Sequence, residues 1–130
     1  MVRIWREVLM INSIGGIIIW TEKDSFTKMV EFYSQILDLK IHSQRDDFVV
    51  FSWKDMRLSL GIHSELYKKN HDPLRIMVNF LTEDIELAFQ TLSLRGVEFV
   101  RIPIREHWGG WVSTFKDPDG NFLQLLQLEN

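Results

Sequence analysis

The sequence repeats one pattern of apolar segments, and this repeat constrains the fold more than any other feature. Ile19-Trp20-Thr21 and Phe80-Leu81-Thr82 occupy matching places, 82 − 21 = 61 residues apart. Arg57-Leu58-Ser59-Leu60 matches Phe122-Leu123-Gln124-Leu125 at a spacing of 122 − 57 = 65 residues. A repeat of about half the chain indicates two copies of one supersecondary unit.

Each half of the chain is predicted to contain a strand, a helix and three further strands. The first helix is expected to begin at Asp24 or Ser25, and its apolar stripe at helical spacing runs to Leu37. The second is expected to follow an N-cap at Thr82 and to end at Gly96. The expected strands are residues 14–20, 40–44, 48–53 and 56–62, then 75–81, 97–104, 110–115 and 121–127.

The composition is that of one ordinary folded domain. The 130 residues carry a formal net charge of −3, and no run of Lys or Arg supplies the basic face that nucleic-acid binding requires. The absence of cysteine excludes disulfides and thiolate ligands. No apolar run is long enough to cross a membrane, and residues 1–6 lack the features of a signal peptide, so we expect a cytoplasmic protein. We expect an N-terminal extension at residues 1–13 and a single domain at 14–130, with modules at about 14–62 and 74–127.

A tight turn between two apolar strands is the sharpest local signal. In Asp117-Pro118-Asp119-Gly120, the proline presets the φ of the second turn residue, and an aspartate suits the third. Gly120 is able to take the left-handed conformation that closes the turn. The turn therefore fixes the place of Gln124 on the strand that follows.

This hairpin and the duplicated pattern together resemble the vicinal-oxygen-chelate superfamily of glyoxalase I, bleomycin-resistance proteins and extradiol dioxygenases. The resemblance covers about residues 14–127. It implies an α+β fold in which two tandem βαβββ modules form a curled mixed sheet with a cleft. It also implies that a ligand is held on the concave side of that sheet.

Strand alternation separates side chains that pack under the helices from side chains that face the ligand. Leu123 and Leu125, for example, point away from Gln124. Trp108 and Trp111 flank two glycines, so a planar ligand is able to approach the backbone there, although core or dimer packing of the rings is equally open. The expected ligand-binding residues are Arg57, Ser59, Arg75, Met77, Asn79, Trp108, Trp111, Phe122 and Gln124.

The resemblance also implies where a divalent metal is bound in the enzymes of the superfamily. The four ligand positions fall on Gly15 or Gly16, Ser59, Met77 and Gln124, the last in place of the usual glutamate. Such an ion prefers carboxylate and imidazole ligands, which these residues do not supply. We therefore expect no metal site and no cofactor, and this counts against the metal-dependent chemistries of the superfamily.

Three further residues are weak candidates for catalysis. His63 ends a row that faces the expected ligand, and Glu106 and His107 precede Trp108. Each is able to act as an acid or base, but a solvated or locally bonded loop residue is the simpler interpretation. Trp20 is expected in the core.

The main hypothesis is a metal-free protein that binds a small molecule, with an aromatic ligand as one option, and works as a homodimer. Its nearest functional analogue is the bleomycin-resistance type, which sequesters a ligand without chemistry. One alternative is a lyase or dioxygenase of the vicinal-oxygen-chelate type, with a metal held by non-standard residues such as His63, Glu106, His107 and Gln124. Another is a dimeric interaction module whose cleft is filled by side chains.

Overall fold

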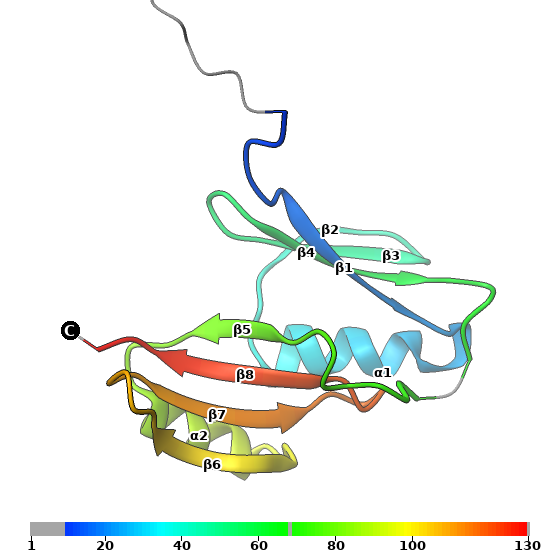
Figure 1. Cartoon of the computed structure of the whole chain (residues 1–130). Coiled ribbons are helices and arrows are strands. Elements are labelled where there is room, and N and C mark those ends of the chain that lie inside the picture. Colours follow the sequence, from blue (N-terminus) through cyan, green and yellow to red (C-terminus); the bar gives the residue numbers. More distant parts are fainter. Residues whose placement is uncertain (1–9, 68, 130) are drawn as a thin grey trace, which may run out of the picture.

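Two separate four-stranded sheets form the protein, one from each half of the chain (Figure 1). The computed structural model describes residues 10–67 and 69–129. In sheet A the strand order is β1-β4-β3-β2, and in sheet B it is β5-β8-β7-β6. The pairs β1–β4 and β5–β8 are parallel, and the other pairs are antiparallel. The strands are β1 (Gly16–Thr21), β2 (Ile41–Gln44), β3 (Phe48–Ser52), β4 (Arg57–Ile62), β5 (Val78–Leu81), β6 (Phe99–Arg105), β7 (Trp111–Lys116) and β8 (Phe122–Gln127).

This architecture confirms the predicted α+β fold of two tandem βαβββ modules. The same strand order recurs in both sheets, as the repeat in the sequence requires. The two sheets of the chain are not closed into one continuous sheet, because β1 and β5 each pair on one side only within the described residues. Residues 1–9 of the expected N-terminal extension lie outside the described part of the chain.

The helices follow the predicted positions with two differences. The first helical segment is divided into η1 (Lys23–Ser25), α1 (Phe26–Glu31) and the π-helical turn η2 (Phe32–Ile36). The second helix, α2 (Ile85–Leu94), is capped by Asp84, whose side chain accepts a hydrogen bond from the Leu87 backbone N–H. The predicted cap at Thr82 is wrong, because its hydroxyl accepts from the Asp84 N–H and so belongs to the preceding turn. The predicted stop at Gly96 is confirmed by its φ of 85°.

One hydrophobic core joins the two modules. Each sheet has a helix-facing side, and in Figure 1 α2 covers that side of sheet B while α1 lies against sheet A. Tyr33 stacks on Phe51 of sheet A, and Phe32 contacts Phe115 of sheet B, with ring centroids 6.2 and 6.4 Å apart. The two residues that begin η2 therefore pack against both sheets at once.

The predicted Asp117–Gly120 turn is present and ties the second module to the first. The Gly120 N–H donates to the Asp117 carbonyl at 3.0 Å, and Gly120 has a φ of 80°. The hydroxyl of Tyr33 donates to the Asp117 carboxylate at 2.7 Å, and the hydroxyl of Thr21 donates to the Asp119 carboxylate. All four of these side chains are buried. We call these two hydrogen bonds the carboxylate latch.

Burial perturbs the ionisable groups of the carboxylate latch. Desolvation raises the pKa of Asp117, although hydrogen bonds from Asn121 and Tyr33 act in the opposite direction. Desolvation likewise raises the pKa of Asp119. The pKa of Tyr33 lies well above its ordinary value, first because of burial and then because of the neighbouring Asp117. Tyr33 is therefore protonated at neutral pH and able to donate its hydrogen bond to Asp117.

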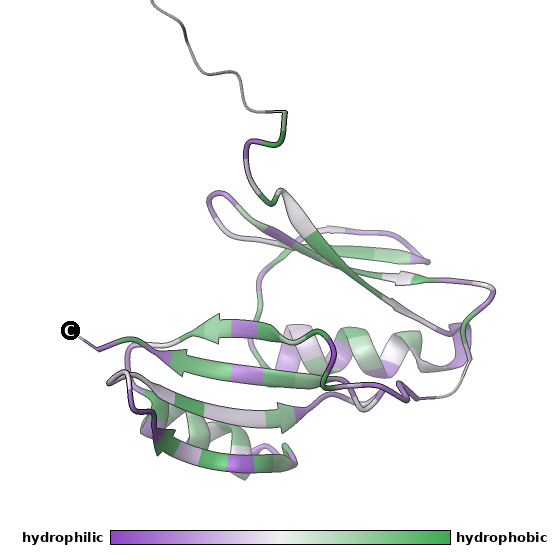
Figure 2. Cartoon of the chain, in the orientation of Figure 1, coloured by the Kyte–Doolittle hydropathy of each residue, from purple (hydrophilic) through white to green (hydrophobic). Residues whose placement is uncertain are grey.

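Apolar residues are concentrated on the strands, and the connections between them are largely polar (Figure 2). None of the helices within residues 10–67 and 69–129 combines the length and the apolar character needed to span a bilayer.

Candidate functional site

The side of each sheet opposite its helix, which we call the open side, carries the candidate site. On sheet B the register places Asn79 beside Gln124, Gln124 beside Thr114, and Thr114 beside Arg101. Paired residues of neighbouring strands point to the same side of a sheet, so these four side chains form one line across all four strands. We call them the polar row.

The polar row is flanked by apolar residues on the same side of sheet B. Leu81, Leu126 and Val112 form the next line of paired residues. Leu81 is 71% exposed. Thr114 and Val112 are buried, so the accessible part of the open side of sheet B combines two amides and a guanidinium with apolar surface.

The open side of sheet A combines apolar side chains with a few polar ones, which are Ser43, Ser52, Arg57 and Ser59. Ser59 lies between Ile18 of β1 and Val50 of β3 in the hydrogen-bond register. In the next line of paired residues, Gly61 lies between Trp20 and Phe48. A Cβ at position 61 would stand 2.7 Å from the Trp20 ring, so the glycine makes room for the indole.

Trp20 is not in the core, so that prediction is wrong. Its side chain is 42% exposed and lies on the open side of sheet A. The apolar run of residues 17–20 concealed this, because alternation within such a run does not reveal which side is covered.

Trp108 lies in the connection between β6 and β7, and Trp111 is the first residue of β7. Trp111 is paired with Gln127 and shares the helix-facing side with Phe115. The Trp108 ring stands over Gly110, where a Cβ would approach it to within 1.9 Å. Trp108 is 47% exposed. The structure therefore does not bring Trp111 together with Gln124.

The remaining predicted ligand-binding residues lie at different places in the two sheets. Arg57 is exposed at the start of β4, where it pairs in register with Gly16. Arg75 precedes β5 and forms an ion pair with Asp72 at 2.6 Å. Met77 also precedes β5, and Phe122 lies on the open side of sheet B beneath the Lys116 ammonium group, 5.8 Å from the ring centroid.

The three weak catalytic candidates do not share contacts with one another. His63 accepts a hydrogen bond from the Glu65 N–H at 3.2 Å and packs edge-on against Trp20. Glu106 forms an ion pair with Arg101 at 2.8 Å, and His107 is exposed in the β6–β7 turn. In the described ranges, no group of three or more His, Asp or Glu side chains is placed to hold a metal ion.

The register also refines where the superfamily's metal ligands would lie. Gln124 is paired with Asn79 rather than with Met77, and Ser59 is paired with Ile18 rather than with Gly15 or Gly16. Ile18 and Asn79 are thus the strand neighbours of these two positions, and of the two only Asn79 was an expected ligand-binding residue. With either set of residues the donors include no carboxylate and no imidazole, so they do not fit a divalent metal centre.

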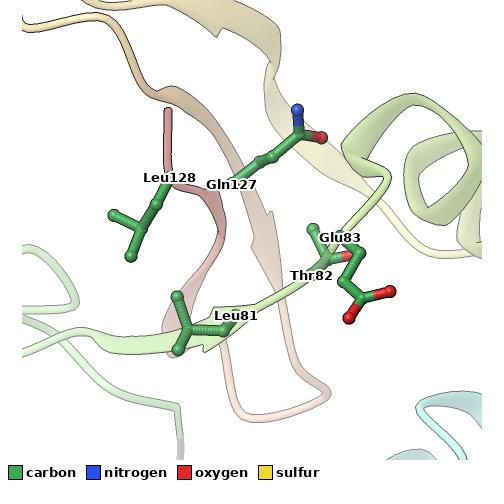
Figure 3. A pocket seen from close by; sticks show the side chains of 5 residues that line it. All are labelled: Leu81, Thr82, Glu83, Gln127 and Leu128. Atoms are coloured by element: carbon green, nitrogen blue, oxygen red, sulfur yellow. The ribbon is translucent and has the colours of Figure 1, made fainter. Parts of the chain in front are cut away.

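A shallow cavity of about 640 Å³ borders the open side of sheet B at the ends of β5 and β8 (Figure 3). Leu81 and Leu128 project into it, whereas the Gln127 side chain accepts a hydrogen bond from the Ile85 N–H at the start of α2. Thr82 and Glu83 complete its lining. The cavity extends the apolar surface beside the polar row.

The predicted ligand-binding residues therefore fall into two sets on two sheets. Asn79, Phe122 and Gln124 lie on the open side of sheet B, and Arg57 and Ser59 belong to sheet A. No strand of one sheet is hydrogen-bonded to a strand of the other within the described residues. Thr114 and Arg101 complete the polar row and were not predicted, because their place depends on strand pairing.

Comparison with known proteins identifies the family. The model of the Glyoxalase/Bleomycin resistance protein/Dioxygenase superfamily matches residues 23–125, and the chain belongs to this superfamily. Uncharacterized protein YetH of Bacillus subtilis (strain 168) is 27% identical over 123 residues, which cover 91% of this chain and 100% of YetH.

Solved structures of the same superfamily share the fold. The crystal structure of a glyoxalase/bleomycin resistance protein/dioxygenase from Nocardioides superposes with a TM-score of 0.76 at 21% identity, covering 93% of this chain and 86% of that one. A superfamily member from Sphaerobacter thermophilus DSM 20745 gives a TM-score of 0.71 at 25% identity, covering 92% of this chain and 100% of that one.

Proposed function

We propose that the protein binds a small organic molecule on the open side of sheet B and does so without the metal site of the superfamily's enzymes. The observation that carries this proposal is the polar row. Its members Asn79 and Gln124 lie in register on the parallel pair β5–β8 and bear uncharged amides. Amides orient a ligand by hydrogen bonds, whereas carboxylates and imidazoles would be needed for a divalent ion.

The chemistry of the polar row favours a ligand that has both hydrogen-bonding groups and an apolar body. Each amide is able to donate and to accept a hydrogen bond, whereas the Thr114 hydroxyl between them and Arg101 is buried. The Arg101 guanidinium is already paired with Glu106, which reduces its attraction for a second anion. A neutral ligand with a carbonyl or amide group therefore fits the row better than a carboxylate or phosphate.

The exposed indoles support an aromatic body for that ligand. Trp20 and Trp108 each present a flat apolar ring above a glycine, one on each sheet. Aromatic rings contribute about 0.5–1.5 kcal/mol per pair beyond simple area burial. These features favour sequestration of a planar compound, as in proteins of the bleomycin-resistance type.

We also infer that the working unit is a homodimer. The open sides expose Ile18, Trp20 and Leu81, an amount of apolar surface that a monomer rarely leaves uncovered. A second copy of the chain is an occupant with the same apolar character. Such pairing would enclose the ligand between an apolar and a polar side.

Ligand screening combined with metal analysis tests the proposed function. Purified protein is expected to contain no stoichiometric divalent metal, and thermal-shift screening of planar neutral amides is expected to find a binder. At about one hundred times its dissociation constant, a ligand adds about 2.7 kcal/mol to the free energy of unfolding. Gln124→Leu should abolish this gain, whereas the matched change Gln35→Leu, at an exposed position of η2, should not.

Two results would contradict the proposal. One is a stoichiometric divalent ion whose removal abolishes ligand binding. The other is a ligand that Gln124→Leu and Gln35→Leu bind equally well, because the polar row would then have no part in recognition.

A further inference from the structure

The residues that lead into β1 expose apolar side chains to solvent. Residues 10–15 extend beyond the start of β1 and away from sheet B (Figure 1). Met10, Ile11 and Ile14 are 95%, 76% and 71% exposed. Apolar side chains are unfavourable in water, and a cluster of them on a surface is typical of a contact with a partner. This segment is therefore a candidate contact element.

The sequence before Met10 continues this apolar character. Residues 1–9 lie outside the described part of the chain. Their large apolar residues are Val2, Ile4, Trp5, Val8 and Leu9. We call residues 1–14 the N-terminal arm. The run of residues 8–11 contains no polar side chain, and on a strand such a run is apolar on both sides, as in strands that are covered on both sides.

The free edge of β1 is suited to a strand of this kind. Within residues 10–67 and 69–129, β1 is paired with β4 only, so its other edge is open to a further strand. Ile18 and Trp20 lie on the open side of sheet A and are 50% and 42% exposed. Ile17 and Ile19 point to the opposite side, and these four residues line one groove. A strand added there meets apolar side chains on both of its sides.

The second module contributes accessible apolar surface to the same groove. Ile76 lines the groove just before β5 and is 77% exposed. Val78, at the start of β5, also lines it and packs against the core. The groove therefore offers a strand edge on the first module and apolar side chains on the second.

The course of the chain before β1 favours the edge of a second copy over the edge of the same copy. The Arg57 N–H donates to the Gly15 carbonyl at 3.3 Å, so the chain follows β4 as far as Gly15. To return along its own β1, the N-terminal arm would have to reverse direction within residues 12–14. Residues 10–14 are exposed throughout, so the structure shows no such return. A second copy offers the same edge without a reversal.

We propose that the N-terminal arm of one copy adds as a strand along the free edge of β1 in a second copy. Two-fold symmetry makes this exchange reciprocal. The backbone hydrogen bonds of the added strand supply affinity, and the apolar side chains on both of its sides fill the groove. This inference rests on the homodimer inferred above and names the segment that joins its two copies. Ligand binding by the polar row of sheet B has no part in it.

A photocrosslinking experiment tests where the N-terminal arm lies. The photoreactive residue p-benzoylphenylalanine replaces Met10 in the full chain, and this protein exchanges subunits with an isotopically labelled wild-type chain. Mass spectrometry is expected to find crosslinks from position 10 to residues 17–20 or 76–78 of the labelled chain. The same photoreactive residue in place of Leu94 is the matched control, because Leu94 is 90% exposed at the end of α2, and it should give no such crosslink.

Substitutions in the N-terminal arm test whether it holds the two copies together. Met10→Ser combined with Ile11→Ser should raise the dissociation constant of the homodimer roughly tenfold or more, because two apolar side chains no longer gain from burial. Sedimentation velocity measures this constant. Leu87→Ser combined with Leu94→Ser, at positions of α2 that are 60% and 90% exposed, is the matched control and should leave it unchanged. Ile76→Ser, in the groove itself, should also raise it.

The arm exchange is overturned if position 10 crosslinks only within its own chain, crosslinks elsewhere on the second copy, or gives no crosslink. It is also overturned if the double substitution in the arm and the one in α2 change the dissociation constant equally. A wild-type chain that stays monomeric removes the homodimer as well. A homodimer that is unaffected by Met10→Ser with Ile11→Ser removes the arm exchange alone.

Discussion

Removal of the Tyr33 hydroxyl is the sharpest test of how the two modules are joined. Tyr33 is fully buried and donates at 2.7 Å to Asp117, whose side chain is also buried. Tyr33→Phe keeps the ring that stacks on Phe51 and removes only the donor. In Tyr33→Phe the Asp117 carboxylate stays buried but has one hydrogen bond fewer. Its desolvation is then less well compensated, and the folded state loses stability.

The expected loss of stability is about 2 kcal/mol, the middle of the range for hydrogen bonds to charged groups. For 130 residues, an unfolding entropy of about 2.1 cal/mol/K per residue gives about 270 cal/mol/K. The melting temperature should therefore fall by about 7 °C. Calorimetry measures this fall in the melting temperature.

The cost of Tyr33→Phe should also depend on pH. Because burial raises the pKa of Asp117, the folded chain binds more protons than the unfolded chain between the unfolded and folded pKa values. Stability from this group therefore rises as the pH falls through that window. Tyr33→Phe removes a hydrogen bond that lowers the pKa, so its cost should be largest above the window and should shrink as Asp117 becomes protonated.

A double-mutant cycle with Asp117→Asn isolates the interaction. Since the asparagine is uncharged, Tyr33→Phe should cost less in that background, with a coupling energy of about 1 kcal/mol. A cost below about 0.5 kcal/mol in the wild-type background, or one that stays constant between acid and neutral pH, would refute the carboxylate latch as a source of stability.

Two further substitutions test local features of the fold. Gly61→Ala would place a Cβ against the Trp20 and Phe48 rings, so it should destabilise the protein by about 1–3 kcal/mol and shift the tryptophan fluorescence; an unchanged spectrum and stability would contradict this packing. Asp84→Ala removes the acceptor of the Leu87 N–H and should cost about 1 kcal/mol in urea unfolding, whereas Thr82→Ala should cost less if Asp84 is the true cap.

Most of the fold was predictable because local chemistry and tertiary structure agree. The turn at Asp117–Gly120 and the helix stop at Gly96 follow from residues that suit those conformations. The cap at Asp84 was missed because Thr82 and Asp84 are both good caps, and only the path of the chain after β5 chooses between them. Local propensity does not contain that path.

The candidate site was less predictable because it depends on strand pairing. Alternation correctly placed Gln124 opposite Leu123, but it did not place Thr114 and Arg101 beside it. Trp111 shows the same limit, since its side of β7 is set by its pairing with Gln127 and not by the neighbouring glycines. Contacts between distant segments, such as Tyr33 with Asp117, have no signal in a single sequence.

The two modules share one strand order but have diverged at the positions that matter for a ligand. The β1–β4 pair presents Ile18 beside Ser59, whereas the equivalent β5–β8 pair presents Asn79 beside Gln124. The first pair offers one apolar side chain and one hydroxyl, whereas the amide pair offers two groups that both donate and accept hydrogen bonds. A ligand that uses both sheets must therefore have one apolar face and one hydrogen-bonding edge. Under the proposed function, this difference between the modules, more than the fold that they share, would determine which molecules the protein selects.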